Sequence, residues 1–335
     1  MEKIIDKIKN KTNEKDDEKN IKFEKMAKNV NLKSKEIKSI NTKGPINDLC
    51  LFPESGNFIE SSGPTIYDGK YNLIKTFSEI GFCDHLSLIS NDIIVLSQKK
   101  NILILVISNL EENNYKYKKF NNSHNNEIKK IIKGLNQDEV ITSDIKGIVK
   151  FWKINDKYNN IELSLIGTLN VPNKDKTYIL LINHILFAVT DKLYIYDINN
   201  YNINKSINSN SLNIKPLCWN SMVVINEKEQ IVAVGCQGCT YIIKINSIND
   251  IKIINEIKLG KTSHESLCLF ENCYLIIGLR NGDIRIFDIK NNYQLISSII
   301  KAHNIKNNFS INGITQISDY SFASYGENKI IKIWN

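Results

Sequence analysis

The sequence predicts an all-β fold built from repeated units. From about residue 35 onward, stretches of four to eight residues rich in Ile, Val, Leu and Tyr alternate with Asn, Asp, Gly and Ser, as strands alternate with turns. One residue closes the third strand of each unit, and these markers are Tyr67, Leu105, Trp152, Tyr196, Ile243, Phe287 and Trp334. Successive markers lie 38, 47, 44, 47, 44 and 47 residues apart, close to the ~40 to 45 residues of a four-stranded propeller blade. We therefore expect a β-propeller with seven four-stranded blades.

The composition favours a single large intracellular domain. The chain has 335 residues, of which 42% are hydrophobic, and a closed repeat fold can use this whole length as one unit. The mean hydropathy is -0.26, and no apolar run approaches the ~20 residues of a membrane span, so we expect no transmembrane segment. Seven cysteines, an odd number, fit a reducing compartment, and the N-terminus lacks the continuous apolar centre of a secretory signal. We therefore expect the cytoplasm or the nucleus.

The net charge of +8 does not by itself indicate a nucleic-acid partner. Almost all of the positive charge is lysine, because Arg280 and Arg285 are the only arginines. Arginine supplies the planar fork that reads phosphates and guanine edges, whereas lysine-rich surfaces often serve only solubility. The joint abundance of Lys, Asn and Ile also resembles the codon bias of an AT-rich genome. The charge therefore identifies no ligand.

Residues 1–33 have the composition of a flexible charged arm. They are rich in Lys, Glu, Asp and Asn and contain few aromatic residues. Residues 21–31 differ, because four apolar residues occupy positions i, i+3, i+4 and i+7: Phe23, Met26, Ala27 and Val30. This stripe predicts a short helix that docks on the domain or on a partner. The alternative is a helix that forms only transiently, since a single apolar stripe cannot stabilise a helix in water.

The last blade requires a strand from the N-terminal region. The sequence ends at Asn335, directly after the seventh marker, so no later residue forms the fourth strand of that blade. Residues 35–42 carry the apolar Ile37 and Ile40, and we expect them to supply this strand. Joining both ends in one sheet covers an edge that otherwise invites aggregation. The propeller then spans residues 34–335.

Residue pairs before and at the markers carry a family resemblance. Ser123-His124, Ser263-His264 and Ala302-His303 precede three of the markers, and residues 278–288 match a strand, turn and strand signature almost position for position. The repeat positions occupied in this way are His124, Trp152, Tyr196, Asp197, His264, Phe287, Asp288, His303 and Trp334. Residues 35–335 thereby resemble the WD40-repeat family of β-propellers. The resemblance implies that the three histidines are structural and bind a hydroxyl on the second strand or the aromatic residue on the third.

Other units depart from the family pattern. Leu105-Val106 and Ile243-Lys244 have lost both residues of the Trp-Asp-like pair, Lys146 stands where the third unit would carry its turn aspartate, and Asn335 replaces the aspartate after the last tryptophan. We therefore expect most of the internal hydrogen-bond sets of the family to be missing.

No motif of a known catalytic site is present. The sequence lacks G-x-S-x-G, a P-loop, G-x-G-x-x-G and H-E-x-x-H, and no nucleophile is arranged around His85 or His184 in a recognisable motif. Cys236-Gln-Gly-Cys239 lies between two strand patterns and is interpreted as a turn, since a zinc site needs four ligands and a redox pair normally sits at a helix start. We expect no enzyme, no cofactor and no metal site.

The resemblance implies one candidate binding surface. In WD40 propellers, the turns between the second and third strands and the loops between blades surround the narrow mouth of the central channel, where peptides are often held. Five of the seven turns carry a basic residue, namely Lys99, Lys100, Lys146, Lys192, Arg280 and Lys329. Lysine is about one residue in eight of the chain. Among seven turns of four residues, roughly three would therefore carry a lysine by chance. This basic rim would steer acidic segments of protein partners, with Arg280 as the best anchor because a guanidinium binds a carboxylate with two hydrogen bonds.

A second candidate surface interleaves aromatic residues with lysines. Its residues are Tyr115, Lys116, Tyr117, Lys118, Lys119 and Phe120. Such a stretch suits stacking on single-stranded RNA with phosphate contacts. The competing interpretation is an outer strand of the second blade, whose lysines protect an exposed edge.

These observations predict a non-catalytic scaffold, a monomeric propeller that binds protein partners as a subunit or adaptor of a larger complex. Residues 287–290, Phe-Asp-Ile-Lys, loosely resemble the Trp-Asp-x-Arg adaptor box of ubiquitin-ligase substrate receptors, with Phe for Trp and Lys for Arg. The alternative is an RNA-associated factor of ribosome assembly or RNA processing. A phosphoinositide-binding propeller lacks support, because the Phe-Arg-Arg-Gly motif of that family is absent.

Overall fold

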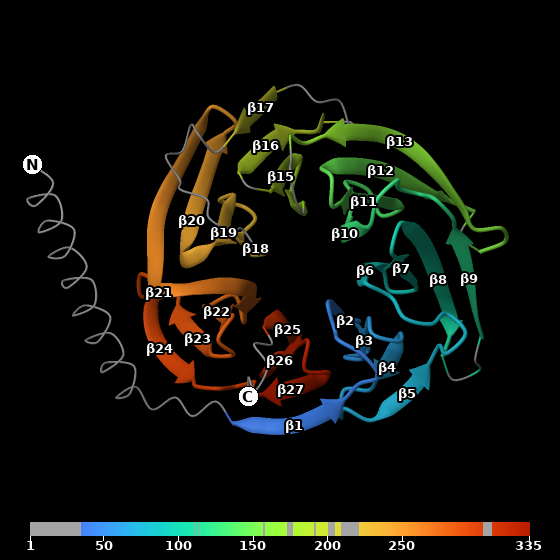
Figure 1. Ribbon diagram of the computed structural model, residues 1–335, viewed down its shortest axis with the longest axis horizontal. Coiled ribbons are helices and arrows are strands. Elements are labelled where there is room, and N and C mark those ends of the chain that lie inside the picture. The colour runs from blue at the N-terminus through green and yellow to red at the C-terminus, as the bar shows by residue number, and fades with distance from the viewer. Residues whose placement is uncertain are drawn as a thin grey trace, which may run out of the picture.

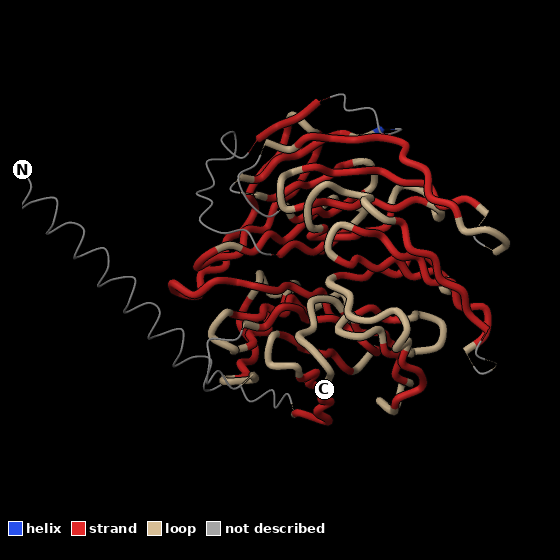
Figure 2. The backbone as a smooth tube through the Cα atoms, turned by 45° about the vertical axis from the view of Figure 1, so that its right-hand side comes forward, coloured by secondary structure: helices blue, strands red, loops and turns tan. Residues whose placement is uncertain are grey.

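The computed structural model describes residues 35–110, 112, 114–156, 158–172, 177–190, 192–199, 205–208, 221–303 and 310–335. The predicted arm of residues 1–33 and its helix near 21–31 lie outside these residues. No α-helix occurs in the described part of the chain, and Figure 2 shows it as strands joined by loops, apart from a 3₁₀ position at Asn199. The prediction of an all-β fold is confirmed.

The described strands form a β-propeller of six sheets placed around a central opening (Figure 1). Four sheets of four antiparallel strands follow the chain: β2 (Leu49–Leu51), β3 (Phe58–Glu60), β4 (Thr65–Tyr67) and β5 (Leu73–Thr76); β6 (His85–Ser90), β7 (Ile93–Gln98), β8 (Asn101–Asn109) and β9 (Asn114–Phe120); β10 (Ile128–Lys133), β11 (Glu139–Asp144), β12 (Ile148–Asn155) and β13 (Glu162–Asn170); β14 (Tyr178–Ile182), β15 (Ile185–Val189), β16 (Leu193–Asp197) and β17 (Lys205–Asn208). In each sheet, the first strand lies nearest the opening and the fourth lies outermost.

The fifth four-stranded sheet joins the two ends of the domain. It contains β1 (Glu36–Asn41), β27 (Ile330–Trp334), β26 (Ser321–Gly326) and β25 (Ile311–Ser318), in that spatial order. β1 runs antiparallel to β27, and Lys332 forms an ion pair of 2.7 Å with Glu36. Ile40 packs into the adjoining core, whereas Ile37 stays 47% exposed beside a shift in the register. The predicted closure by an N-terminal strand is confirmed.

The sixth sheet differs from the prediction, because it has seven strands instead of four. Its strands are β18 (Ser221–Asn226), β19 (Ile231–Gly235), β20 (Gln237–Ser247), β21 (Asp250–Phe270), β22 (Tyr274–Leu279), β23 (Ile284–Asp288) and β24 (Gln294–Ile299). β21 is continuous, since Ser263 still pairs with Gln237 of β20 while the next residue, His264, already pairs with Leu279 of β22. The expectation of seven separate four-stranded blades is therefore wrong for residues 221–299.

Apolar side chains pack between neighbouring sheets. In the described residues, seven core clusters occur, and six of them join one sheet to the next around the ring. The seventh packs the two halves of the seven-stranded sheet on each other, with Ala233 and Ile242 on one side and Leu275 and Phe287 on the other. Both faces of each sheet are covered. For this reason the sequence of a central strand such as β7, the second of its sheet, is a continuous apolar run and does not alternate between apolar and polar residues.

Candidate binding site at the channel mouth

The register of the sheets brings two kinds of segment to the same end of the propeller. Ile128, at the start of the innermost strand β10, pairs with Asp144, at the end of β11, so the β11–β12 turn follows at that end. His85 at the start of β6 and Ser97 near the end of β7 show the same pairing. The first residues of the innermost strands therefore lie beside the turns between second and third strands. We call this end the mouth face.

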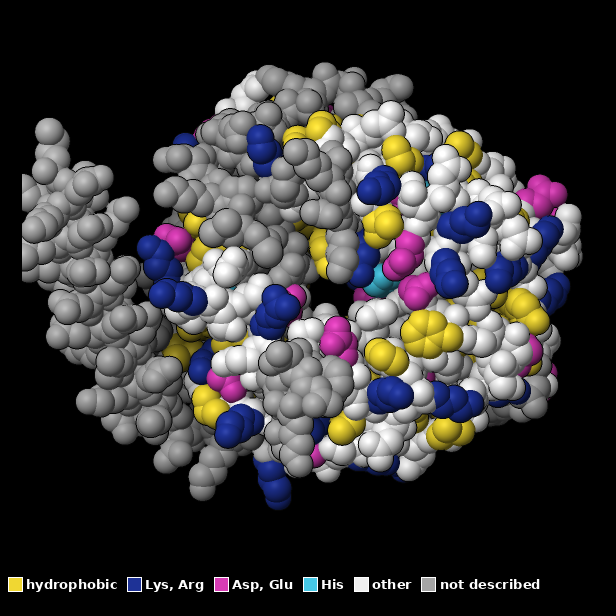
Figure 3. All heavy atoms as spheres, in the orientation of Figure 1, with side chains coloured by type: hydrophobic (Ala, Val, Ile, Leu, Met, Phe, Trp, Pro, Cys, Tyr) yellow, Lys and Arg dark blue, Asp and Glu magenta, His cyan; other side chains and the backbone are white. Residues whose placement is uncertain are grey.

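A cavity of about 500 Å³ lies in the central opening. The innermost strands β2, β6, β10, β14, β18, β21 and β25 all contribute residues to its wall. Apart from His85, its charged lining residues balance, with three acids and three lysines: Asp48, Glu265, Glu327, Lys129, Lys130 and Lys133. Figure 3 likewise shows acidic and basic side chains bordering the opening. The wall of the cavity is therefore polar and mixed in charge.

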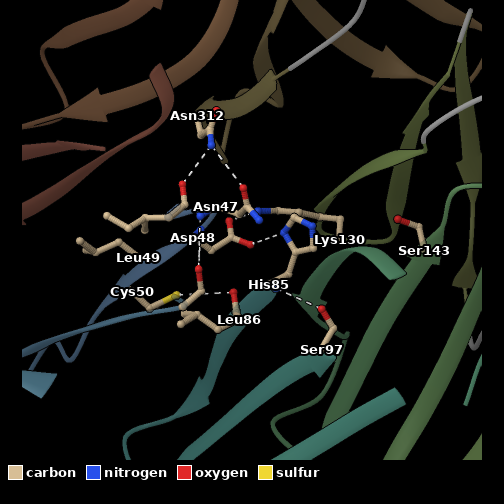
Figure 4. A network of polar contacts seen from close by, with 12 residues as sticks. Asn47, Asp48, Leu49, Cys50, His85, Leu86, Ser97, Lys130, Ser143 and Asn312 are labelled. Carbon is tan, nitrogen blue, oxygen red and sulfur yellow. Dashed lines mark hydrogen bonds and ion pairs between the residues drawn. The ribbon is translucent and has the colours of Figure 1, made fainter. Parts of the chain in front are cut away.

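Three charged or titratable side chains from consecutive sheets meet in this wall (Figure 4). Asp48, directly before β2, accepts a hydrogen bond of 2.7 Å from the Nζ of Lys130 on β10. Its other carboxylate oxygen lies 2.8 Å from Nδ1 of His85, the first residue of β6. We call these three residues the channel triad. The triad connects the first three sheets at the cavity.

Buried serines hold the backbone of the triad in place. Ser61 Oγ accepts a hydrogen bond of 3.3 Å from the backbone N–H of Asp48, and Ser97 Oγ accepts one of 3.1 Å from the N–H of His85. Ser143 occupies the matching position opposite Lys130, where its hydroxyl donates to the carbonyl of Thr177 in the next sheet. Serine hydroxyls thus bind the backbone of Asp48 and of His85, whereas the serine opposite Lys130 links its sheet to the next one.

The electrostatics of the triad keep Asp48 and Lys130 charged. Burial of the Asp48 carboxylate opposes its ionisation, but the charge of Lys130 and the hydrogen bond with His85 outweigh this effect and lower the pKa of Asp48 to about 2. Burial likewise opposes the charge of Lys130, and the nearby Asp48 carboxylate raises the pKa of Lys130 above its ordinary value. The two side chains therefore form an ion pair at neutral pH.

An amide and a close-packed ring form the adjoining wall on the β25 side. Asn312 on β25 donates from Nδ2 to the Ile46 carbonyl at 3.1 Å and to Asn47 Oδ1 at 3.2 Å. The Tyr325 ring lies across Gly313, where a Cβ atom would meet the ring at 2.2 Å, so a larger residue there would displace the ring. These contacts fix the β25 side of the cavity against β2.

The surroundings of His85 determine what the channel triad can do chemically. An Asp–His pair orients an imidazole as in general-base catalysis, and in covalent catalysis a nucleophilic side chain also lies within hydrogen-bond reach of the other ring nitrogen. Among the described residues, no hydroxyl or thiol is hydrogen bonded to Nε2 of His85. The same part of the chain holds no group of three or more His, Cys, Asp or Glu side chains arranged to bind a metal ion. The wall of the cavity presents a carboxylate, an imidazole, an ammonium group and an amide in fixed positions.

The six predicted rim residues lie in turns of the mouth face. Lys99 and Lys100 connect β7 to β8, Lys146 connects β11 to β12, and the others follow the same pattern: Lys192 between β15 and β16, Arg280 between β22 and β23, and Lys329 between β26 and β27. Lys192 is half-buried and the other five are exposed. None of the six lines the cavity. The fold brings them to one face but not into one site.

The candidate RNA-binding stretch forms β9, the outermost strand of its sheet. The Tyr115 ring packs edge-on against Phe77, with 4.9 Å between centroids, and its hydroxyl donates to Glu79 at 2.7 Å. Phe120 packs against the neighbouring core, so Tyr117, 43% exposed, is the one aromatic residue of β9 open for stacking. The location agrees with the edge-strand interpretation. A platform for successive bases needs several exposed rings.

Two of the three predicted structural histidines bind as expected. His124 Nε2 lies 2.7 Å from Thr142 Oγ1 on the second strand, and Trp152 Nε1 donates to the same oxygen at 2.8 Å. The last blade repeats this arrangement with equal distances, using His303, Ser324 and Trp334. Each hydroxyl therefore serves as a hub for two buried rings.

His264 departs from the expectation. Its Nδ1 lies 2.7 Å from Thr240 Oγ1 on β20, the strand before β21, because the facing second-strand segment 276–278 is Ile-Ile-Gly and offers no hydroxyl. The remaining repeat residues are structural: Tyr196 and Phe287 are buried, and Asp197 and Asp288 accept hydrogen bonds from N–H groups of the turns that follow.

The missing turn aspartate of the third unit is also explained. Asp144, two residues before Lys146, accepts from the backbone N–H groups of Lys146 and Ile148 at 2.8 and 3.0 Å. Its second oxygen lies 3.5 Å from His124 Nδ1. A carboxylate thus holds the β11–β12 turn and lies beside the histidine, but from a different sequence position.

The channel triad escaped the sequence analysis, although the repeat period contains a signal for it. His85 and Lys130 lie 37 and 82 residues after Asp48, and the first three markers lie 38 and then 47 residues apart. The three residues therefore occupy nearly the same phase of successive repeats. Searching one phase for charged residues of opposite sign would have found them.

Comparison with known proteins leaves the family open. No protein-family model matches the sequence, and no curated protein matches it. The part of the chain that the structure describes contains no helix that could span a bilayer.

Proposed function

We propose that the domain is a seven-bladed propeller of the WD40 type, in which two blades share the long strand β21. Counting β21 once with the three strands before it and once with the three after it gives two sets of four strands. The apolar cluster between these two halves has the same position as the clusters between separate sheets. The histidine and tryptophan pairs on the Thr142 and Ser324 hydroxyls add sequence-specific support.

We further propose that the protein is a non-catalytic scaffold of the cytoplasm or nucleus that binds a protein segment at the mouth face. The observation that carries this proposal is the cavity of about 500 Å³ with the channel triad in its wall. A peptide side chain that enters the cavity meets a carboxylate, an imidazole, an ammonium group and amides in fixed positions. The exposed cations of the basic rim then attract acidic residues that flank this side chain.

Affinity purification with mass spectrometry tests the scaffold function. The whole chain is compared with Arg280→Glu, which reverses a rim charge, and with Asn312→Leu, which removes an amide from the cavity wall. Lys252→Glu on the outer part of β21 is the matched control, because Lys252 is exposed and far in the fold from the innermost strands. We expect one set of proteins that the two mouth variants lose and the control retains. Loss with the control alone, or turnover of a substrate by the purified chain, would contradict the proposal.

The nature of the captured set distinguishes the narrower alternatives. A ubiquitin-ligase adaptor among the retained proteins would favour a substrate receptor. Ribosome-assembly factors whose capture is abolished by ribonuclease would favour the RNA-associated alternative, and direct RNA binding should then weaken steeply with salt. The structure favours protein binding, since a single exposed aromatic residue on β9 offers little stacking surface.

A further inference from the structure

The turn between β19 and β20 brings two cysteine thiols together. In Cys236-Gln237-Gly238-Cys239, the backbone N–H of Cys236 donates to the Cys239 carbonyl at 2.9 Å, and Gly238 takes a positive φ of 82°. The two cysteines thus face each other across a tight hairpin turn. Their Sγ atoms are 2.8 Å apart.

The backbone of this turn is compatible with a disulfide. Residues directly opposite in an antiparallel pair have Cα atoms about 4.5 to 5.5 Å apart, which lies within the range of about 4.4 to 6.8 Å found in disulfides. The turn packs closely on the backbone of β21: a Cβ atom on Gly238 would lie only 2.6 Å from the carbonyl oxygen of Gly260. This contact limits the movement of the turn. The thiols can therefore be joined without rearranging the sheet.

The two thiols differ in their chemistry. The hydrogen bond between them raises the pKa of Cys236 and lowers the pKa of Cys239, which the Tyr241 side chain lowers further. Cys239 is 8% exposed and Cys236 is 1% exposed. The Cys236 thiol also donates to the Cys239 carbonyl at 3.1 Å, so its proton is held within the turn. The greater exposure of Cys239 and this contact favour Cys239 as the nucleophile and Cys236 as the resolving thiol, since the thiolate is the reactive form of cysteine. Such limited exposure admits a small oxidant more readily than a bulky disulfide.

We propose that Cys236 and Cys239 form a peroxide-reactive dithiol that closes to a reversible disulfide. The Cys239 thiolate attacks one oxygen of hydrogen peroxide, the O–O bond breaks, and a sulfenic acid and hydroxide form. The Cys236 sulfur then attacks the Cys239 sulfur, an S–S bond forms, and the hydroxyl group leaves with the Cys236 proton as water. Two electrons pass from the two thiols to the peroxide, and a small dithiol later reduces the disulfide back to two thiols by exchange and is itself oxidised.

Other described cysteines provide internal controls for this chemistry. Burial raises the pKa of the Cys83 and Cys268 thiols to about 12. Cys83 donates to a backbone carbonyl, that of Gly81, at 3.8 Å, and Cys268 to that of Leu269 at 3.4 Å. Both should stay reduced under conditions that oxidise the pair.

The test uses the purified full chain treated with hydrogen peroxide. After the peroxide is removed, the protein is denatured, alkylated with N-ethylmaleimide and analysed by peptide mass spectrometry. We expect Cys236 and Cys239 to lose alkylation together, with a mass lower by two hydrogen atoms, and dithiothreitol to restore both. Cys83 and Cys268 should remain alkylated. Continued alkylation of Cys236 and Cys239, or equal loss at all four cysteines, would overturn the proposal.

Two variants separate the roles of the thiols. Cys236→Ser should stop the reaction at a sulfenic acid on Cys239, which a 1,3-dione probe traps. Cys239→Ser should abolish trapping at position 236, and Cys268→Ser is the matched control that should behave like the parent chain. Trapping at Cys236 in the Cys239→Ser variant, or none at Cys239 in the Cys236→Ser variant, would refute the assignment of nucleophile and resolving thiol. Far-ultraviolet circular dichroism before treatment establishes that each variant is folded.

Discussion

Mild acid should destabilise the propeller through its buried histidines. Burial lowers the pKa of His264 and that of His303 to about 4, from an ordinary value of 6.5. As pH falls, the unfolded chain therefore binds protons on these residues before the folded chain does. The stability that depends on the neutral imidazoles is complete above pH 6.5 and is lost between pH 6.5 and 4.

The size of this loss follows from the two pKa values. A tenfold difference in proton affinity corresponds to 1.36 kcal/mol, so each histidine contributes roughly 3 kcal/mol once the pH is below 4 and about 2 kcal/mol at pH 5. His264 lies on β21 and His303 follows β24, with separate hydroxyl partners, so their contributions should nearly add. We expect the free energy of unfolding to fall by about 4 kcal/mol between pH 8 and pH 5.

Urea denaturation at pH 8, 6.5, 5 and 4 measures this dependence. The His303→Gln variant should be less stable than the parent chain at pH 8 because it loses a buried hydrogen bond, but its further loss between pH 8 and pH 5 should be smaller than that of the parent by about 2 kcal/mol. His184→Gln is the matched control, since His184 is exposed. Equal stability at pH 6.5 and pH 4, or the same acid-induced loss in His303→Gln and the parent, would refute the reasoning. Asp48 should add a further loss between about pH 4 and pH 2, where its carboxylate becomes protonated.

Three further predictions concern the hydroxyl hub, the channel triad and ring closure. Thr142→Val should lower the free energy of unfolding by roughly 2 to 5 kcal/mol, because it leaves two buried rings without their shared partner, while Thr142→Ser should cost less than about 1 kcal/mol; equal urea midpoints for these variants would contradict this role. Lys130→Met should destabilise by about 2 kcal/mol at pH 7 and raise the pKa of Asp48, measurable by carboxylate NMR titration; an unchanged pKa would exclude the ion pair as its cause. Deleting residues 1–43 should remove β1, lower the free energy of unfolding by on the order of 3 kcal/mol and so lower the thermal midpoint, whereas deleting residues 1–33 should change neither. Equal thermal midpoints for the two deletions would disprove closure by β1.

The sequence was sufficient to predict the elements that local pattern determines. Each marker lies in the strand where the repeat places it, from Tyr67 in β4 to Trp334 in β27. β1 was predictable because strand pattern precedes the first blade and the last marker is followed by one residue. Local signals did not reveal the continuity of β21. Gly260 interrupts the apolar pattern as a turn residue would, and only the pairing of Ser263 with Gln237 across the sheet extends the strand.

The channel triad depends on tertiary structure in a stronger sense. Asp48, His85 and Lys130 meet only because three inner strands converge on one opening, and each residue alone reads as an ordinary polar position at a strand start. The hydrogen-bond partner of His264 was not predictable for a related reason. Its partner Thr240 belongs to the preceding strand, and that contact exists because β21 crosses between the two halves of its sheet.

Under the proposed scaffold function, Lys130 of the channel triad and the exposed cations of the basic rim should serve different purposes in binding. The charge of Lys130 is neutralised by Asp48 at 2.7 Å, so the channel triad exerts little attraction at a distance and instead presents fixed groups at contact. The side chains of Arg280 and Lys99 form no ion pair within the described residues, and both are exposed. Unpaired surface charge acts over about 8 Å at physiological ionic strength and mainly changes association rates, whereas buried polar contacts mainly change dissociation rates. The rim would therefore govern how fast an acidic segment arrives, and the cavity would govern which side chain stays.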